Sequence, residues 1–185
     1  YKLNKNKNDY YTKRAKEQST NITKKIKKVG ESVGLEVKHI NDLDINSMYA
    51  EYAPCQYNDS IFFFAGVRPL DAKLADTSFI YANYLTRVIQ ATRRNDSTWS
   101  NVKVVSSLID PNAHVNNLSF TRDGKTAYFS KCFGYNCSIY KADFDPKFLD
   151  FSNVTKLPAP INMAQTSNTT PQIAYTSQGD YLFFA

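Results

Sequence analysis

The stretch INSMYAEYAPCQYNDSIFFFA, residues 45–65, sets the pattern for most of this chain. It contains an Asn-bearing loop, a Pro, a short turn and a dense aromatic strand. The same order of parts returns in PNAHVNNLSFTRDGKTAYFS, residues 111–130, and in INMAQTSNTTPQIAYTSQGDYLFFA, residues 161–185. Self-similarity of this kind indicates a fold built from repeated supersecondary units.

Two further landmarks extend the repeat beyond its aromatic strand. Ile80-Tyr81 recurs as Ile139-Tyr140, and an aromatic-Ser-Asn-Val unit at 99–102 recurs at 151–154. Each full copy therefore predicts four strands, namely an inner strand, the aromatic strand, the Ile-Tyr strand and an outer strand near Ser-Asn-Val. The first two strands of each copy should be joined by tight turns at Asn58-Asp59, Asp123-Gly124 and Gly179-Asp180.

Four-stranded units of this length are typical of β-propeller blades. An irregular insertion at 66–77 lengthens the first unit. We expect a mainly β fold, a partial β-propeller of two blades and the start of a third, preceded by one amphipathic α-helix. The core of the repeats should consist of the aromatic residues Phe62, Phe63, Phe64, Tyr81, Trp99, Tyr128, Phe129, Tyr140, Phe151, Phe183 and Phe184.

The helix is expected over residues 8–33, because Ile22, Ile26, Val29 and Val33 recur at helical spacing. Residues 1–28 carry ten basic and two acidic side chains, so the rest of the chain has a balance of −2 within the net charge of +6. A basic amphipathic helix can bind an anionic membrane or nucleic acid. We favour a helix that docks its apolar stripe on a neighbour, with residues 1–36 as a helical region and residues 37–185 as the propeller. Nucleic acid is not expected, because few aromatic residues interleave with the lysines.

Cys132 and Cys137 flank Phe-Gly-Tyr-Asn between two strand-like runs. This spacing places them near opposite ends of a hairpin loop, within reach of a disulfide. A disulfide would imply an oxidising compartment. The alternative is a pair of packed thiols, and zinc is disfavoured because no second Cys or His pair completes a set of ligands.

The sequence contains no recognisable catalytic motif. His39 and His114 lack a nucleophile and an acid in any local pattern, and the six glycines form no phosphate-binding loop. Asp143, Asp145 and Asp150 offer oxygen ligands, but without the bend Gly and closing Glu of a calcium loop. Carboxylate pairs of glycosidases leave no local signature. We expect no catalytic residue, no cofactor and no metal.

The repeat resembles the TolB-type, WD-like propeller repeats of bacterial envelope proteins. The matching residues are Asn46, Pro54, Asn58-Asp59 and Phe63-Phe64; Asn112, Ser119, Asp123-Gly124 and Tyr128-Phe129; and Asn162, Pro171, Gly179-Asp180 and Phe183-Phe184. The likeness covers about residues 37–185, although the first copy lacks the turn Gly and the second lacks the Pro. A helix leading into such repeats is similar to the junction between tetratricopeptide-type helices and the propeller in Bacteroidetes envelope lipoproteins. Some of these belong to the type IX secretion and gliding machinery, and some carry an OmpA-like domain.

The resemblance implies a non-catalytic scaffold that is periplasmic and associated with the outer membrane. Its partners would be other envelope or secretion-machinery proteins, and peptidoglycan or the membrane would be reached through regions outside this sequence. A chain that begins at Tyr1 without Met or a signal peptide is expected to be an excerpt of a longer polypeptide. Two alternatives are a propeller-associated hydrolase whose active residues lie elsewhere, and a basic-helix module that binds anionic lipid or nucleic acid. In a scaffold, recognition would fall to the loops, the insertion at 66–77 or the helix.

Overall fold

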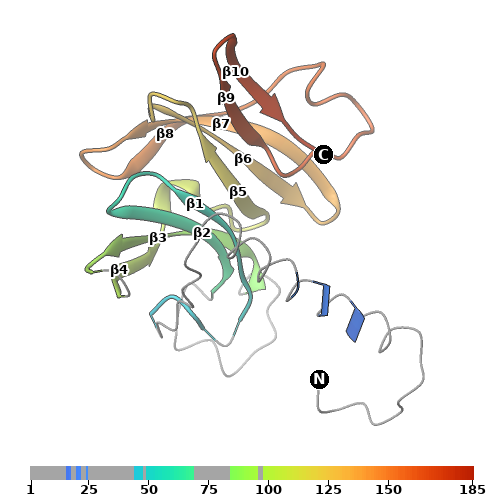
Figure 1. Ribbon diagram of the computed structural model, residues 1–185. Helices are drawn as coiled ribbons and strands as arrows, with labels where there is room; N and C mark the ends of the chain where they lie inside the picture. The colour runs from blue at the N-terminus through green and yellow to red at the C-terminus, as the bar shows by residue number, and fades with distance from the viewer. Residues whose placement is uncertain are drawn as a thin grey trace, which may run out of the picture. The chain divides into compact units, whose positions relative to one another are not determined.

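A computed structural model describes residues 16–17, 20–21, 24, 44–47, 49–68, 84–95 and 98–185. The chain divides into two units, residues 1–40 and 41–185, where the sequence led us to expect a boundary after residue 36. The first unit contributes five described residues, all exposed. The strands of the second unit form three antiparallel sheets (Figure 1).

The first sheet contains β1 (Glu51–Gln56), β2 (Ile61–Val67), β3 (Thr86–Arg93) and β4 (Trp99–Val104), paired in that order. The second sheet contains β5 (His114–Phe120), β6 (Thr126–Phe133), β7 (Asn136–Asp145) and β8 (Asp150–Lys156), again in chain order. The third sheet is the hairpin of β9 (Gln172–Thr176) and β10 (Gly179–Phe183). A short 3-10 helix, η3 (Ser106–Leu108), connects the first two sheets.

The expected fold class, a partial propeller preceded by an amphipathic helix, is wrong for the described chain. Its strands form two four-stranded sheets and one two-stranded sheet, which do not close into a propeller, because a closed ring needs about four to eight four-stranded units. No α-helix is among the elements of the described residues. Most of the expected helix at 8–33 falls outside those residues, and the five described positions within it are locally helical but define no element. The fold is mainly β and antiparallel.

The four strands expected in the second copy are all present in the predicted order. The turn at Asp123-Gly124 lies between β5 and β6, Ile139-Tyr140 lies in β7, and Phe151 lies in β8. The third copy differs from expectation, because its turn is Ser177-Gln178 and Gly179 already pairs with Thr176 in the ladder.

In the first copy, the third strand lies further along the chain than the sequence suggested. Phe64 pairs with Ile89 on β3, whereas Phe129 of the second copy pairs with Tyr140 on β7. Val88-Ile89 therefore holds the place that the sequence pattern predicts for Ile80-Tyr81. Those two residues, and residues 69–77 of the expected insertion, lie outside the described part of the chain.

A repeated backbone feature accompanies the repeated sequence. Ala53, Asn117 and Thr170 each have a positive φ, of 51°, 56° and 53°. The pairing of β1 with β2 skips residues at Ala53, and the pairing of β5 with β6 skips residues at Asn117. Both of these inner strands therefore carry a bulge. Asn101 and Asn153 of the two Ser-Asn-Val units also have positive φ, and the outer-strand ladders are irregular there. Asn tolerates the left-handed region better than most residues, which explains why both units keep Asn at this position.

The main core lies between the first and second sheets. The rings of Phe63, Phe120, Phe144 and Phe151 meet there with centroids 4.8–6.2 Å apart. Offset and edge-on contacts at such distances are favourable beyond the area they bury. Phe63 is completely buried because the second sheet covers its face of β2.

The expected aromatic core holds for the first two sheets but not for the third. Phe64, Phe129 and Phe151 are buried and Phe62, Trp99, Tyr128 and Tyr140 partly so, whereas Tyr81 lies outside the described residues. Phe183 and Phe184 are 61% and 41% exposed. They differ from their counterparts in that no described strand pairs with the outer side of β10. No helix in the described ranges is long and apolar enough to cross a membrane.

Candidate functional site

The hairpin of β6 and β7 presents the most exposed aromatic side chain among the described residues. Phe133 pairs with Asn136, which leaves Gly134 and Tyr135 as the turn. Gly134 has a φ of 57°, a conformation that glycine adopts without a side-chain penalty. Tyr135 is 98% exposed and Phe133 is 48% exposed. We refer to residues 133–136 as the hairpin tip.

A disulfide joins the two strands directly below the hairpin tip. Cys132 and Cys137 face each other in the ladder and are bonded through their sulfur atoms. The Cys137 N–H donates to the Ser167 hydroxyl at 3.0 Å, and its carbonyl accepts from the Asn168 N–H at 2.9 Å. Residues opposite each other in an antiparallel ladder exchange either both backbone hydrogen bonds or neither. The disulfide is therefore the direct link between the strands at this level.

The linker between β8 and β9 supports the same hairpin on the side of β7 where β8 does not pair. The Ser167 hydroxyl also donates to the Tyr135 carbonyl at 2.9 Å, so one side chain holds both the turn and β7. Further along, the Asn162 side chain accepts from the Ile139 N–H at 2.8 Å and donates to the Ile139 and Leu157 carbonyls. The linker thus takes the place of β8 along the first half of β7. The hairpin tip is held by the disulfide to β6 on one side and by the linker on the other.

The charges near the hairpin tip are already paired. The Lys131 ammonium lies 2.6 Å from an Asp110 carboxylate oxygen and over the Phe133 and Tyr140 rings. The hydrogen bond from Lys131, with help from the Asn112 backbone, holds the pKa of Asp110 below its ordinary value. What the hairpin tip offers is therefore an uncharged aromatic surface.

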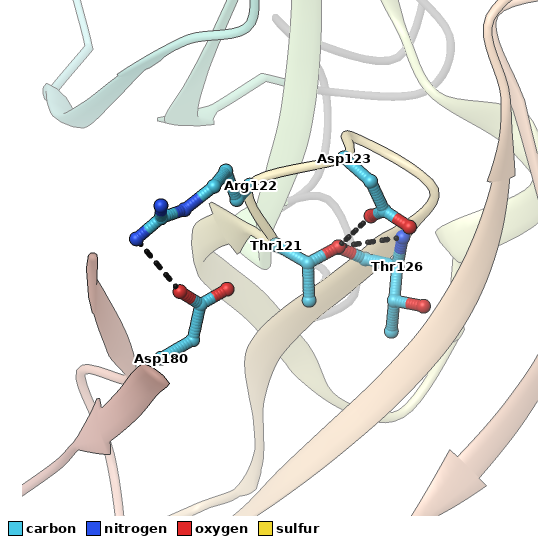
Figure 2. Close-up of a pocket in the computed structure, with 5 residues that line it drawn as sticks. All are labelled: Thr121, Arg122, Asp123, Thr126 and Asp180. Atoms are coloured by element: carbon cyan, nitrogen blue, oxygen red, sulfur yellow. Dashed lines mark hydrogen bonds and ion pairs between the residues drawn. The ribbon is translucent and has the colours of Figure 1, made fainter. Parts of the chain in front are cut away.

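A second candidate is an open hollow of about 440 Å³ between the β5–β6 turn and the start of β10 (Figure 2). Arg122 forms an ion pair with Asp180 at 3.2 Å, and the Thr121 hydroxyl donates to Asp123 at 2.7 Å. That hydrogen bond lowers the pKa of Asp123. Arg122 also donates to the Thr176 carbonyl and lies over the Tyr175 ring. The charged groups that line this hollow are thus engaged by other groups of the protein. Those of Arg122 and Asp180 link the third sheet to the second.

A smaller hollow, of about 120 Å³, lies where the three inner strands meet. Its lining combines the three left-handed residues with their neighbours, namely Ala53, Pro54, Asn117, Leu118, Thr170, Pro171 and Gln172. None of these side chains is charged. A left-handed residue at this point is a backbone feature common to all three copies of the repeat, and in β1 and β5 it lies in a bulge.

Polar side chains join the first sheet to the second at the start of β5. The Thr86 N–H donates to Nδ1 of His114 at 3.1 Å, and the Tyr52 hydroxyl donates to the Thr86 hydroxyl at 3.1 Å. Burial and the nearby Arg87 lower the pKa of His114. A ring nitrogen that accepts from an N–H must be unprotonated, so His114 is neutral here and serves as an inter-sheet contact.

The acidic residues considered for calcium do not form a site. Asp145 lies opposite Asp150 in the ladder and caps the Lys147 N–H, while Asp143 accepts from Asn153. Within the described ranges, no three His, Cys, Asp or Glu side chains are placed to hold a metal. His39 lies outside those ranges. Cys55 is a partly buried free thiol whose pKa burial raises to about 11.

Sequence reasoning identified the cysteine pair but missed the residues that support it. The sequence indicates Asn162 only as a member of the repeat. Ser167 and Asn168 lie 30 or more residues from the hairpin in a polar linker with no periodic pattern, so no local signal could have identified them. Comparison with known proteins adds no further assignment, because no family model, curated protein or solved structure matches this chain.

Proposed function

We propose that this chain is a non-catalytic protein–protein interaction module, a scaffold of the bacterial cell envelope. The observation that carries the proposal is the fully exposed Tyr135 on a hairpin held by a disulfide and by the linker. Tyr is among the residues that most often dominate binding energy at interfaces. Holding the backbone that carries such a side chain in place before binding lowers the ordering cost of association.

The chemistry of the hairpin tip favours a folded protein as the partner. Lys131, whose ammonium lies over the Phe133 ring, is engaged by Asp110, so within the described part of the chain the hairpin tip itself offers no free positive charge of the kind that nucleic acids and anionic lipids require. An exposed phenol ring fits a concave apolar pocket with a hydrogen-bond acceptor for its hydroxyl group. The partner is therefore a protein that offers such a pocket.

The disulfide supports an extracytoplasmic location for this module. Disulfides persist in oxidising compartments such as the bacterial periplasm. Together with the repeat resemblance, this favours a periplasmic, outer-membrane-associated scaffold, with the type IX secretion or gliding apparatus as the machine in which it would serve. Partners would be other proteins of that apparatus.

Site-specific photo-crosslinking in the native envelope tests the proposal. A benzophenone analogue of Phe is placed at position 135 of the full chain, and the same analogue at Phe148 serves as a control. Phe148 is also well exposed, at 68%, but lies between β7 and β8, away from the disulfide. We expect one reproducible protein adduct from position 135 and none at comparable yield from position 148. Equal yields at both positions, or none at either, would contradict the proposal.

A further inference from the structure

The hairpin tip depends on one covalent bond that solvent can reach from one side. Cys132 is buried, with 6% of its surface exposed, whereas Cys137 is partly exposed and is preceded by the exposed Asn136. Of the two residues, Cys137 is therefore the one more open to an external thiolate. This asymmetry defines which sulfur is attacked and which one leaves.

Reduction by a dithiol can be written with all atoms and electrons accounted for. One thiolate of the dithiol attacks the Cys137 sulfur, the bond to Cys132 breaks, and Cys132 leaves as a thiolate that takes up a proton. The second thiol of the dithiol then attacks the mixed disulfide and releases Cys137 as a thiol. Two electrons and two protons pass to the protein, and the dithiol becomes a cyclic disulfide.

The loss of this bond acts locally. The Cys137 backbone groups bind the linker and not β6, so the disulfide is what joins the strands at this level. Two residues further on, both backbone groups of Ile139 are held by Asn162, and that contact does not involve sulfur. Opening the disulfide should therefore release the hairpin tip while β7 stays in place beyond it.

We propose that the Cys132–Cys137 disulfide is a redox-sensitive latch that holds Tyr135 in its binding position when oxidised and releases it when reduced. The inference rests on the proposed function, because it assigns a means of regulation to the same surface. The reductant it needs is a protein or small-molecule dithiol. In the reduced protein the hairpin tip must be ordered anew on binding, so affinity for the partner should fall by about tenfold.

Amide hydrogen exchange on the full chain, with and without dithiothreitol, tests the latch. Alkylation and mass spectrometry first confirm the redox state, and two thiols should become newly accessible on reduction. Cys55 serves as an internal reference, because a partly buried thiol with its pKa raised to about 11 reacts slowly in both states. Loss of the closure of this short loop should accelerate exchange of the Cys137 amide by about tenfold or more. The Ile139 amide should change less than twofold.

Two outcomes would overturn the latch. An unchanged Cys137 amide would show that the linker alone holds the hairpin tip, and equal acceleration at Cys137 and Ile139 would show that the disulfide holds the whole sheet. The double variant Cys132→Ser with Cys137→Ser should reproduce the reduced pattern without reductant. If amide exchange in this variant equals that of the oxidised protein, the acceleration at Cys137 is caused by the reductant itself. The proposal of a redox-sensitive latch would then be wrong.

Photo-crosslinking from position 135 separates this inference from the proposed function. The oxidised chain should give the adduct and the reduced chain about one tenth of its yield. Equal yields in both redox states would leave the interaction module standing and overturn the latch. No adduct from the oxidised chain would overturn the interaction module, and the latch would then be judged by amide exchange alone.

Discussion

The interface between the first and second sheets differs in kind from the interface between the second and third. The first is a cluster of aromatic rings with Phe63 and Phe120 at its centre. The second contains one buried aliphatic side chain on the hairpin, Ile173, together with several hydrogen bonds. Ser119 accepts the Ile173 N–H, and Ser130 accepts the Thr170 N–H.

This difference between the two interfaces indicates how strongly each sheet is coupled to its neighbour. Burial of several rings stabilises an interface through many small van der Waals contacts and a large buried apolar area. The rings pack on one another, so these contacts are lost together when the sheets separate. A few hydrogen bonds contribute about 1 kcal/mol each in net terms, but leaving one buried partner unsatisfied costs more. The first two sheets should therefore unfold together, whereas the third can separate without them.

The largest effect should come from the aromatic interface. Phe63→Ala should lower the free energy of unfolding of residues 41–185 by about 3–5 kcal/mol, because it removes a fully buried ring and leaves a cavity. Urea denaturation followed by circular dichroism measures it. The matched control is Phe148→Ala, an exposed ring whose loss should cost less than about 0.5 kcal/mol. Similar losses in both variants would argue against a single aromatic core.

The polar interface should respond locally and less strongly. Ser130→Ala removes the acceptor of the Thr170 N–H and should cost about 1–3 kcal/mol. The loss should appear as faster amide exchange in β9 and β10, with exchange in β2 and β3 unchanged. Ser138→Ala is the control, because that hydroxyl forms no hydrogen bond with any described residue. Faster exchange in all three sheets would show that they form one cooperative unit.

A smaller effect is expected where Tyr57 of the first sheet reaches the β5–β6 turn of the second. Gly124 has a φ of 68°, and a Cβ there would lie 2.8 Å from the Tyr57 hydroxyl oxygen. Gly124→Ala should therefore cost about 1–2 kcal/mol, from backbone strain together with the clash. Gly134→Ala carries the strain alone, since a Cβ there would meet nothing within 4 Å. Thermal denaturation of both variants separates the backbone strain from the clash with Tyr57. Equal losses of stability in the two variants would show that the clash contributes nothing.

The smallest effect concerns pH and the His114 contact between the first two sheets. The pKa of His114 is lower in the folded protein than the ordinary value of 6.5, so the unfolded chain binds the proton more tightly. This contribution to stability is complete above pH 6.5 and is lost as the pH falls through the folded-state pKa. The urea midpoint should drop between pH 7.5 and pH 5.5, and His114→Gln should reduce that drop. His39→Gln should leave it unchanged, and a drop that depends on His39 instead would contradict the assignment.

The sequence predicted the second sheet well because its signals agree with one another. The turn at Asp123-Gly124, the alternating strands around Phe129 and the Ile139-Tyr140 pair all specify the same register. The first sheet was ambiguous, since Ile80-Tyr81 and Val88-Ile89 both offer an apolar pair for the third strand. Only the pairing of Phe64 with Ile89 decides between them, and cross-strand pairing is not encoded locally.

The third sheet and the site show two further limits of local patterns. Gly179-Asp180 has the composition of a turn, yet the hairpin register puts the turn at Ser177-Gln178. The cysteine spacing predicted where a disulfide could form. Its support by Ser167 depends on a long linker folding back on β7, and such a contact leaves no trace in composition or spacing.

The left-handed Asn101 and Asn153 also bear on how the protein avoids aggregation. Each lies in the outermost strand of its sheet, β4 or β8, where a row of unpaired backbone groups would otherwise invite another chain to add. The ladder irregularity at each Asn bends the strand and interrupts that row near its middle. Replacing either Asn by a β-branched residue that straightens the strand would therefore create a template for intermolecular pairing while leaving the buried core untouched.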